Sequence, residues 1–252
     1  MSELSARLGY TTNDTTKDHQ PPPGMDKHLV ALYRPASWEA ERYRMLRRAI
    51  ERSYEPDRRR VIAVTSATAG EGKTTTAVNL AAVLSEIPRT SVLLVDADFR
   101  CSSVARVLGH RVAPPDLGQA LLNPELSLNE VVRRAPHGAR FHVAPSMPCR
   151  SLAHEMVDSP RLEELLAVAR NNYDYVVVDA PPLLPVADCK GIARCVDGFL
   201  LVVAAERTSR RLLGDALGSM EPSKLLGFVL NDAEEPVWVG NSRYYLKYGP
   251  LP

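Results

Sequence analysis

The sequence predicts a doubly wound α/β fold, in which a mostly parallel sheet carries helices on both faces. Three observations predict it. Short runs recur that are apolar at every position, which is typical of strands buried on both faces of a parallel sheet. Several of these runs alternate with segments of helical character, as a doubly wound layer requires. A glycine-rich turn follows the first run, at a strand end where ligands of such sheets bind.

The elements are expected in the following order. An amphipathic helix over residues 38–52 comes first, with Ser37 as its N-cap and Pro35 keeping the preceding chain extended. The predicted strands are 61–64, 91–95, 141–143, 175–178, 199–203 and 226–230. The predicted helices that follow are 73–86, 117–122, 126–134, 160–171 and 209–220.

Three parts of the chain differ in character. Residues 1–27 are polar, include Pro21–Gly24 and show no hydrophobic period, so a disordered or extended arm is expected. Residues 28–240 carry the regular pattern and are expected to form one domain. Residues 241–252 mix Gly and Pro with clustered tyrosines and are expected to form a flexible tail.

Composition and charge narrow the class of protein. The 252 residues are 45% hydrophobic and 24% charged, and the net charge of +1 gives no global attraction to nucleic acid or membranes. Apolar runs reach about eight residues, against roughly 20 for a membrane span, and no signal-peptide core is present. We therefore expect a cytoplasmic protein without a membrane span. Its four cysteines fit no zinc or redox motif, and are Cys101, Cys149, Cys189 and Cys195.

The turn at residues 65–75 has the character of a phosphate-binding loop. Glycines let backbone N–H groups point inward, and the following helix N-terminus adds positive potential. Lys73 can reach the β- and γ-phosphates, Thr74 can ligate Mg²⁺, and Thr75 can support the α-phosphate. Ala67 stands where the strict pattern has glycine, so the loop is a variant; the alternative is a chance glycine-rich turn. The predicted nucleotide-binding residues are Ala69, Gly70, Glu71, Gly72, Lys73, Thr74 and Thr75.

Carboxylates end two of the other predicted strands. Asp96 and Asp98 follow the strand at 91–95, and Asp179 follows the strand at 175–178. Near a phosphate loop, such carboxylates hold Mg²⁺ or accept a proton from a nucleophile. The alternative is that they are solvated loop residues. Arg100, just after this pair, is either a surface arginine or an interface residue.

These three motifs resemble the Walker A, Walker A′ and Walker B motifs of the bacterial tyrosine kinases (BY-kinases). Those are cytoplasmic kinases of polysaccharide export systems, related to the MinD/ParA P-loop ATPases. The resemblance extends from about residue 35 to 248. It implies a P-loop kinase domain over 28–240, ATP and Mg²⁺ as cofactors, and protein-tyrosine kinase activity. It also implies Lys73, Asp96 and Asp98 as catalytic residues, with Asp96 accepting the tyrosine proton.

The resemblance further implies metal ligands, a base contact and a partner. Thr74, with Asp98 or Asp179, would hold Mg²⁺. Asn231, at the end of the last strand, resembles the adenine-contacting asparagine of these folds, although a turn asparagine is an equal alternative. The stand-alone form without a membrane span implies a membrane activator of the polysaccharide co-polymerase type, which would recruit the kinase to the inner face of the plasma membrane.

Two further features resemble this family more than its ATPase relatives. Glu41, Arg44 and Arg47 match the ExxRxxR motif, which in the family lies at a ring interface between subunits; the alternative is a solvated, salt-bridged helix face. Arg100 is assigned to the same interface. The tail resembles the autophosphorylation cluster of the family, which we expect a neighbouring subunit to modify in trans; the alternative is chance clustering or tyrosines docked on the core. Its candidate tyrosines are Tyr244, Tyr245 and Tyr248.

Two rival functions remain at this stage. A MinD/ParA-like ATPase, acting as a nucleotide-dependent dimerisation switch, usually carries an extra lysine early in the loop, and residues 66–69 contain none. A pure interaction module with an inactive nucleotide site is disfavoured because Lys73, Thr74 and the three carboxylates are all present. Proline, usual in the family before the loop glycine, is replaced here by Ala69.

Overall fold

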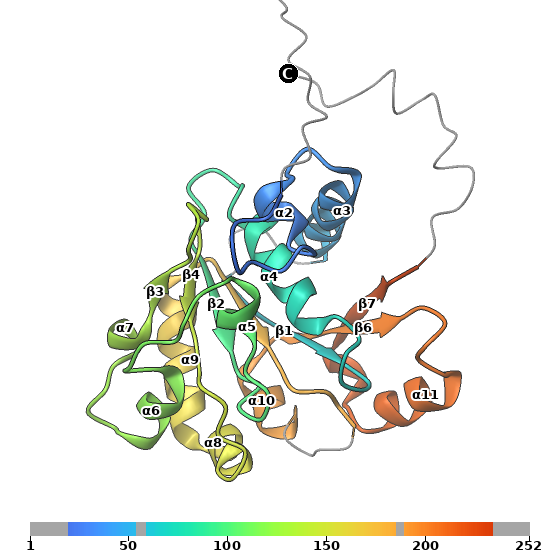
Figure 1. Cartoon of the computed structure of the whole chain (residues 1–252). Coiled ribbons are helices and arrows are strands. Elements are labelled where there is room, and N and C mark those ends of the chain that lie inside the picture. Colours follow the sequence, from blue (N-terminus) through green and yellow to red (C-terminus); the bar gives the residue numbers. More distant parts are fainter. Residues whose placement is uncertain (1–19, 54–58, 185–188, 234–252) are drawn as a thin grey trace, which may run out of the picture.

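The computed structural model describes residues 20–53, 59–184 and 189–233, which form a seven-stranded sheet with helices on both faces (Figure 1). The strand order is β3-β4-β2-β5-β1-β6-β7, and every neighbouring pair is parallel except β3 with β4. The strands are β1 Arg60–Ser66, β2 Val92–Asp96, β3 Arg133–Arg134, β4 His142–Ala144, β5 Tyr175–Asp179, β6 Gly198–Ala204 and β7 Leu225–Asn231. The doubly wound fold predicted from the sequence is confirmed.

The helices lie between these strands and at the N-terminal side of β1. They are α2 Val30–Tyr33, α3 Trp38–Arg52, α4 Lys73–Leu84, α5 Val104–Val107, α6 Leu117–Leu122, α7 Leu128–Val131, α8 Ala153–Asp158, α9 Pro160–Asn172, α10 Cys189–Cys195 and α11 Arg210–Gly218, with a 3₁₀ turn η1 at Pro222–Lys224. The Ser37 hydroxyl accepts the Ala40 N–H, so the predicted cap of α3 is present.

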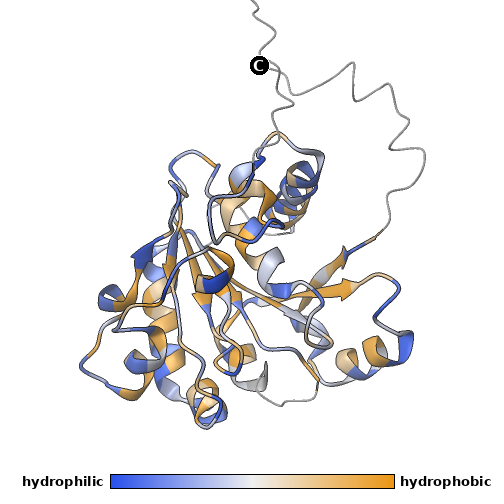
Figure 2. Cartoon of the chain, in the orientation of Figure 1, coloured by the Kyte–Doolittle hydropathy of each residue, from blue (hydrophilic) through white to orange (hydrophobic). Residues whose placement is uncertain are grey.

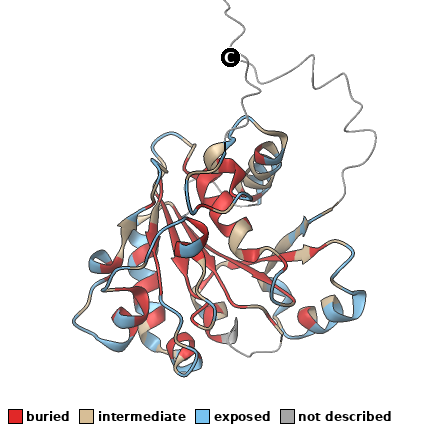
Figure 3. Cartoon of the chain, in the orientation of Figure 1, coloured by how far each residue is buried: buried red, intermediate tan, exposed pale blue. Residues whose placement is uncertain are grey.

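The central strands are buried on both faces because successive side chains enter different hydrophobic layers. Ile62 and Val64 of β1 pack in the layer that contains α4. Val61 and Ala63 pack in the layer that contains α9. Figures 2 and 3 show these strands as apolar and buried, with the exposed, polar residues on the outer helices. This two-sided burial explains why the strand sequences show no polar alternation.

Some elements differ from the sequence-based prediction. The helix expected at 126–134 is only α7, because the chain turns into the short antiparallel strand β3. The short helices α2, α5, α8 and α10 were not predicted, since four to seven residues are too few for a helical period to be recognised. Strand β7 is a sheet edge and is not buried on both faces: Phe228 is 52% and Leu230 is 64% exposed.

The boundary of the N-terminal arm needs correction. Residues 20–27, assigned from the sequence to a disordered arm, pack against the domain in the structure. Met25 is buried and pairs with Leu108, and the Asp26 N–H donates to the Val107 carbonyl at 2.8 Å. The apolar side chain of Met25 joins the core and thereby offsets the polar composition around it. Residues 1–19 and the tail at 241–252 lie outside the described residues.

Within the described part of the chain, every helix is too short or too polar to span a bilayer.

Candidate nucleotide and catalytic site

The phosphate loop connects β1 to α4 and requires glycine at two positions. Gly70 and Gly72 have φ values of +82° and +94°, a region that other residues adopt at a cost. A Cβ atom on Gly72 would lie 2.1 Å from Asn231 Nδ2, so a side chain there is also excluded sterically. Both requirements agree with the sequence-based identification of this turn.

Glu71 stabilises the loop from within. Its side chain is buried, and Oε1 accepts hydrogen bonds from the Thr68 N–H at 3.1 Å and the Thr68 hydroxyl at 2.6 Å. Oε2 accepts from the Ala67 N–H at 3.3 Å. The carboxylate therefore holds the start of the loop, and only the backbone of Glu71 is available to a nucleotide.

The predicted carboxylates meet beside the loop because β2 and β5 are neighbours. Asp96 and Asp179 are register partners at the ends of these parallel strands, and both are fully buried. Lys73 Nζ lies 2.8 Å from Asp98 Oδ2 and 3.4 Å from Asp179 Oδ1. The Thr74 hydroxyl donates to Asp179 Oδ2 at 2.6 Å. The structure thus brings together all five residues that the sequence placed in the catalytic and metal sites.

Burial and charge shift the titration of this cluster. Burial, reinforced by the charge of Asp179, raises the pKa of Asp96 well above its ordinary value. Burial also raises the pKa of Asp179, although Lys73 and Thr74 oppose the rise. Burial alone would lower the pKa of Lys73, but the charges of Asp179 and Asp98 outweigh it and raise that pKa. Lys73 is therefore the cation that makes this cluster of carboxylates tolerable.

Asp96 has one bonded oxygen and one that has no hydrogen-bond partner. Oδ2 accepts the N–H groups of Ser103 and Val104, both at 3.1 Å. Oδ1 is buried without a partner among the described residues. An unpartnered buried carboxylate oxygen with a raised pKa has the properties of a proton acceptor or of a metal-facing ligand.

Oxygen atoms suited to Mg²⁺ converge on this cluster, from Thr74, Asp98 and Asp179. The described residues contain no group of three or more His, Cys, Asp or Glu side chains arranged to hold a metal alone. Mg²⁺ bound with a nucleotide needs only one or two carboxylates, since phosphates and water complete its shell. The residues present fit a nucleotide-dependent Mg²⁺ site.

A pocket of about 780 Å³ adjoins the loop and has the size of a small-molecule site. Asn231 lines it and donates from Nδ2 to the Glu71 carbonyl at 3.0 Å, which places it beside the phosphate loop. Its contact with an adenine base stays a prediction. Sequence reasoning missed other lining residues, including Lys27, His28, Tyr33, Arg34, Tyr43 and Arg207. For the residues between 27 and 34, the sequence signal was the apolar pair Leu29 and Val30, which is buried in the domain.

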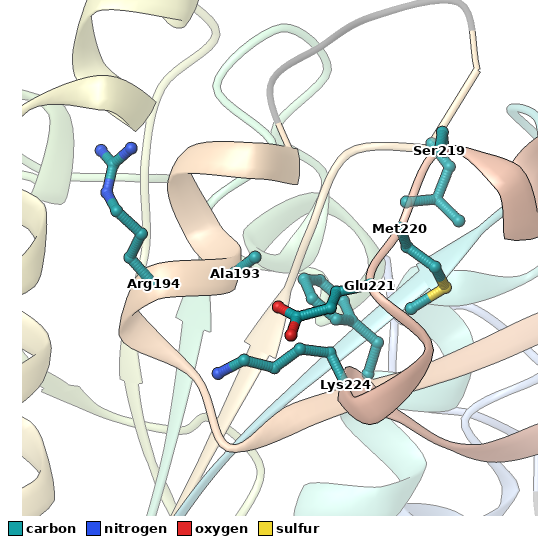
Figure 4. A pocket seen from close by; sticks show the side chains of 8 residues that line it. Ala193, Arg194, Ser219, Met220, Glu221 and Lys224 are labelled. Carbon is teal, nitrogen blue, oxygen red and sulfur yellow. The ribbon is translucent and has the colours of Figure 1, made fainter.

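A separate pocket of about 400 Å³ lies between α10 and the segment around η1 (Figure 4). Arg194, Met220, Glu221 and Lys224 are among its lining residues. None of the predicted site residues in the described part of the chain lines it.

The ExxRxxR residues make contacts within their own chain. Arg44 forms two hydrogen bonds of 2.8 Å to the carboxylate of Glu86, just after α4, and lies 3.3 Å from Glu41. Arg47 donates to the Val83 carbonyl at 2.7 Å and lies 3.2 Å from Glu86. The arginine side chains are 19% and 15% exposed. These contacts join α3 to the end of α4, whether or not a neighbouring subunit also binds there.

Replacing Arg44 with alanine is expected to destabilise the protein by about 1–2 kcal/mol, because two charge-assisted hydrogen bonds are lost. Chemical denaturation would measure it. Glu86→Ala is the matched variant: it breaks the same contact and leaves the ExxRxxR residues in place. If light scattering shows loss of oligomers in Arg44→Ala but not in Glu86→Ala, Arg44 also acts between subunits.

Arg100 is close in sequence to the site residue Asp98, and the predicted tyrosines lie outside the described residues. Arg100 follows Asp98 by two residues, is half-buried, and its carbonyl accepts from Arg150 Nε at 3.4 Å. Tyr244, Tyr245 and Tyr248 belong to the part of the chain after residue 233, so their position relative to the site stays a prediction.

The fold and this site define a P-loop nucleotide-binding protein. A family described as AAA domain matches residues 59–211, and tyrosine-protein kinase YwqD of Bacillus subtilis is 34% identical over 211 residues, covering 82% of this chain and 86% of YwqD. The chain belongs to the bacterial tyrosine kinase family, which confirms the family and the enzyme class predicted from the sequence.

Other relatives extend the comparison. The succinoglycan biosynthesis transport protein ExoP of Rhizobium meliloti is 35% identical over 216 residues, which are 81% of this chain but only 26% of ExoP. The kinase domain of Escherichia coli tyrosine kinase ETK has the same fold, with a TM-score of 0.75, 24% identity, and coverage of 94% of this chain and 90% of that one. Cobyrinic acid a,c-diamide synthase of Mycobacterium smegmatis, with bound ADP and magnesium, has a TM-score of 0.55 at 26% identity, covering 68% of this chain and 74% of that one.

Proposed function

We propose that this protein is an ATP-dependent protein-tyrosine autokinase that phosphorylates Tyr244, Tyr245 and Tyr248 in trans and thereby regulates polysaccharide synthesis and export. The observation that carries the proposal is the buried cluster of Lys73 with three carboxylates at the phosphate loop. An ordinary ATPase needs one strand-end carboxylate beside its loop, whereas here Asp96 at the end of β2 and Asp98 just after it add two more. Relatives named as tyrosine-protein kinases align with this chain over most of its length.

In the proposed reaction, the loop N–H groups and Lys73 bind the β- and γ-phosphates of ATP. Lys73 exchanges its contact with Asp98 for the phosphate oxygens, so its charge is available where negative charge develops. Bound Mg²⁺, held by Thr74 with Asp98 or Asp179, would supply further charge neutralisation. Asp96 accepts the proton of the tyrosine hydroxyl, for which its raised pKa suits it.

The proposed assembly is a homo-oligomeric ring in which Glu41, Arg44, Arg47 and Arg100 contribute to subunit contacts. The α3–α4 pair, fastened by Glu86, would present this surface as a rigid unit. Each phosphorylated tyrosine adds about −1.5 to −2 charge at pH 7, which would repel the tail from the acidic site and favour ring dissociation.

The proposed location is the cytoplasm, at the inner face of the plasma membrane. A membrane protein of the polysaccharide co-polymerase type would recruit and activate the kinase there. The relation to ExoP, a succinoglycan biosynthesis transport protein, supports such a partner.

Mixing two complementary variants tests transfer in trans. One chain keeps its site but has all three tail tyrosines replaced by phenylalanine; the other keeps its tail but carries Asp96→Asn. After incubation with labelled ATP and Mg²⁺, with and without the cytoplasmic fragment of a polysaccharide co-polymerase, we expect label only on the Asp96→Asn chain. Phosphotyrosine mapping by mass spectrometry identifies the residue.

The wild-type chain alone and with the fragment provides the reference. ATP hydrolysis without phosphotyrosine in either condition would contradict the proposal and favour the alternative, a MinD/ParA-like ATPase switch. Label on wild-type protein that is absent from the mixture would contradict only the trans arrangement.

A further inference from the structure

Side chains that follow or end strands β6 and β7, on one side of β1, hold two consecutive carbonyl groups of the phosphate loop. Arg207 Nη2 donates to the Gly70 carbonyl at 3.0 Å. Asn231 Nδ2 donates to the Glu71 carbonyl, also at 3.0 Å. Arg207 lies in the turn after β6 and Asn231 ends β7, so both donors are distant from the loop in sequence. The pocket beside the loop is lined by Gly70, Arg207 and Asn231, but not by Glu71.

A carbonyl contact determines where the next N–H group points. The C=O and N–H of a trans peptide lie in one plane and point in opposite directions. Holding the Gly70 carbonyl therefore orients the Glu71 N–H, and holding the Glu71 carbonyl orients the Gly72 N–H. Among the described residues, neither N–H group donates to a backbone carbonyl. Phosphate loops bind phosphate oxygens through N–H groups of this kind.

The backbone beside both donors adopts an uncommon conformation. Glu206, next to Arg207, has φ +61°, and Asp232, next to Asn231, has φ +55°. Non-glycine residues in this region are unfavourable and persist where surrounding contacts hold them. Arg207 Nη2 also lies 2.9 Å from Asp232 Oδ2, so the two turns are tied to each other as well as to the loop.

We propose that Arg207 and Asn231 are positioning residues of the phosphate loop, with Asp232 orienting Arg207. They turn the Glu71 and Gly72 N–H groups toward the phosphates of a bound nucleotide. The inference rests on the proposed function only for nucleotide binding. It does not depend on tyrosine as the phosphate acceptor, so binding measurements test it separately from the kinase proposal.

Arg207→Ala is the diagnostic variant, because Asn231 is also the residue to which the family resemblance assigns a contact with the base. We expect the dissociation constants for MgADP and MgATP to increase about tenfold, because one charge-assisted contact to the loop is lost. The affinity for adenosine, measured by displacement of a fluorescent ADP analogue at fixed ionic strength, should stay within about twofold. In kinase assays KM should rise while kcat stays nearly constant, since ground and transition states share these phosphate contacts.

Three further variants separate positioning from charge. Arg211→Ala removes an arginine that is 92% exposed and should leave all affinities unchanged. Arg207→Lys retains the charge without the forked donor and should recover less than half of the lost affinity. Asp232→Ala should have a smaller effect than Arg207→Ala and add nothing to it in the double variant, because Asp232 acts through Arg207.

Several outcomes would overturn the proposal. These are an ADP affinity within twofold of wild type in Arg207→Ala, an equal loss for adenosine, or full recovery in Arg207→Lys. Melting temperatures are recorded for every variant. Arg207 is 58% exposed, so its replacement is expected to leave the fold intact.

Discussion

Replacing Lys73 with methionine is expected to abolish phosphotransfer and also to destabilise the folded protein by about 3–5 kcal/mol at neutral pH. Lys73 is 9% exposed and is the cation in contact with Asp98 and Asp179. Methionine has a similar length but no charge, so it leaves buried carboxylates unpaired. The rate should fall by at least about 10²–10³-fold, as for other losses of a preorganised charge.

The destabilisation of Lys73→Met should depend on pH. Without the lysine, protonating the buried carboxylates is the remaining way to avoid buried charge, and the pKa values of Asp96 and Asp179 are already raised. A group with a raised folded pKa loses stability as pH rises through that pKa. The stability deficit relative to wild type should therefore be largest at neutral pH and shrink in mildly acidic buffer.

Calorimetry of Lys73→Met and wild type, from mildly acidic to neutral pH, measures this stability deficit. The matched control is the double variant Lys73→Met with Asp98→Asn, which removes the lysine's contact partner as well. We expect it to regain part of the stability but none of the activity. If Lys73→Met melts at the wild-type temperature at neutral pH, the buried ion pairs do not stabilise this fold. Any experiment that uses Lys73→Met as an inactive reference should first establish that it is folded.

Asp96→Asn is expected to have the opposite effect on stability and a similar effect on activity. Asparagine can still accept the Ser103 and Val104 N–H groups through its carbonyl oxygen, so the start of α5 stays in place. It cannot ionise, which removes the repulsion from Asp179. The melting temperature near pH 7 should rise by about 2–4 °C per kcal/mol gained. Tyrosine phosphorylation should fall about 10²–10⁴-fold, the contribution of a general base.

Scanning calorimetry without nucleotide tests the expected rise in melting temperature. Phosphotyrosine mapping in the presence of ATP tests the expected loss of activity. The raised pKa of Asp96 means that wild type loses stability relative to Asp96→Asn as pH rises above the ordinary carboxyl range. The gain in melting temperature should therefore grow from acidic to neutral pH. A lower melting temperature, or activity within tenfold of wild type, would remove Asp96 from the proposed role.

Much of this site could be predicted because local sequence sets local geometry. The glycines at positions 70 and 72 imply a turn with positive φ, and the apolar strand and helix on either side imply a phosphate loop. Asp96 and Asp179 follow buried strands, and parallel strands place their carboxyl ends at one edge. These inferences needed no knowledge of which strands were neighbours.

The contacts of α3 were beyond such reasoning. The spacing of Glu41, Arg44 and Arg47 places them on one helix face, but the spacing does not say what that face meets. Glu86 has no distinguishing pattern around it, and it receives both arginines only because α3 packs on α4. The N-terminal segment was misassigned for a related reason. Residues 20–27 are mostly polar, and the sequence does not show that Met25 among them pairs with Leu108 and packs into the core.

By itself, the sequence determined the fold class, the phosphate loop, its carboxylates and the enzyme family. These depend on short runs whose meaning is local: burial on two faces, glycine turns, and charged residues at strand ends. Only the tertiary structure decided that Lys73 is paired with Asp98 and Asp179, and that the segment 27–34 contributes to the lining of the pocket. It alone showed that Arg207 and Asn231 hold the loop carbonyls. Such contacts join residues far apart in the chain, and their energies depend on burial and distance, which exist only after the strands have found their neighbours.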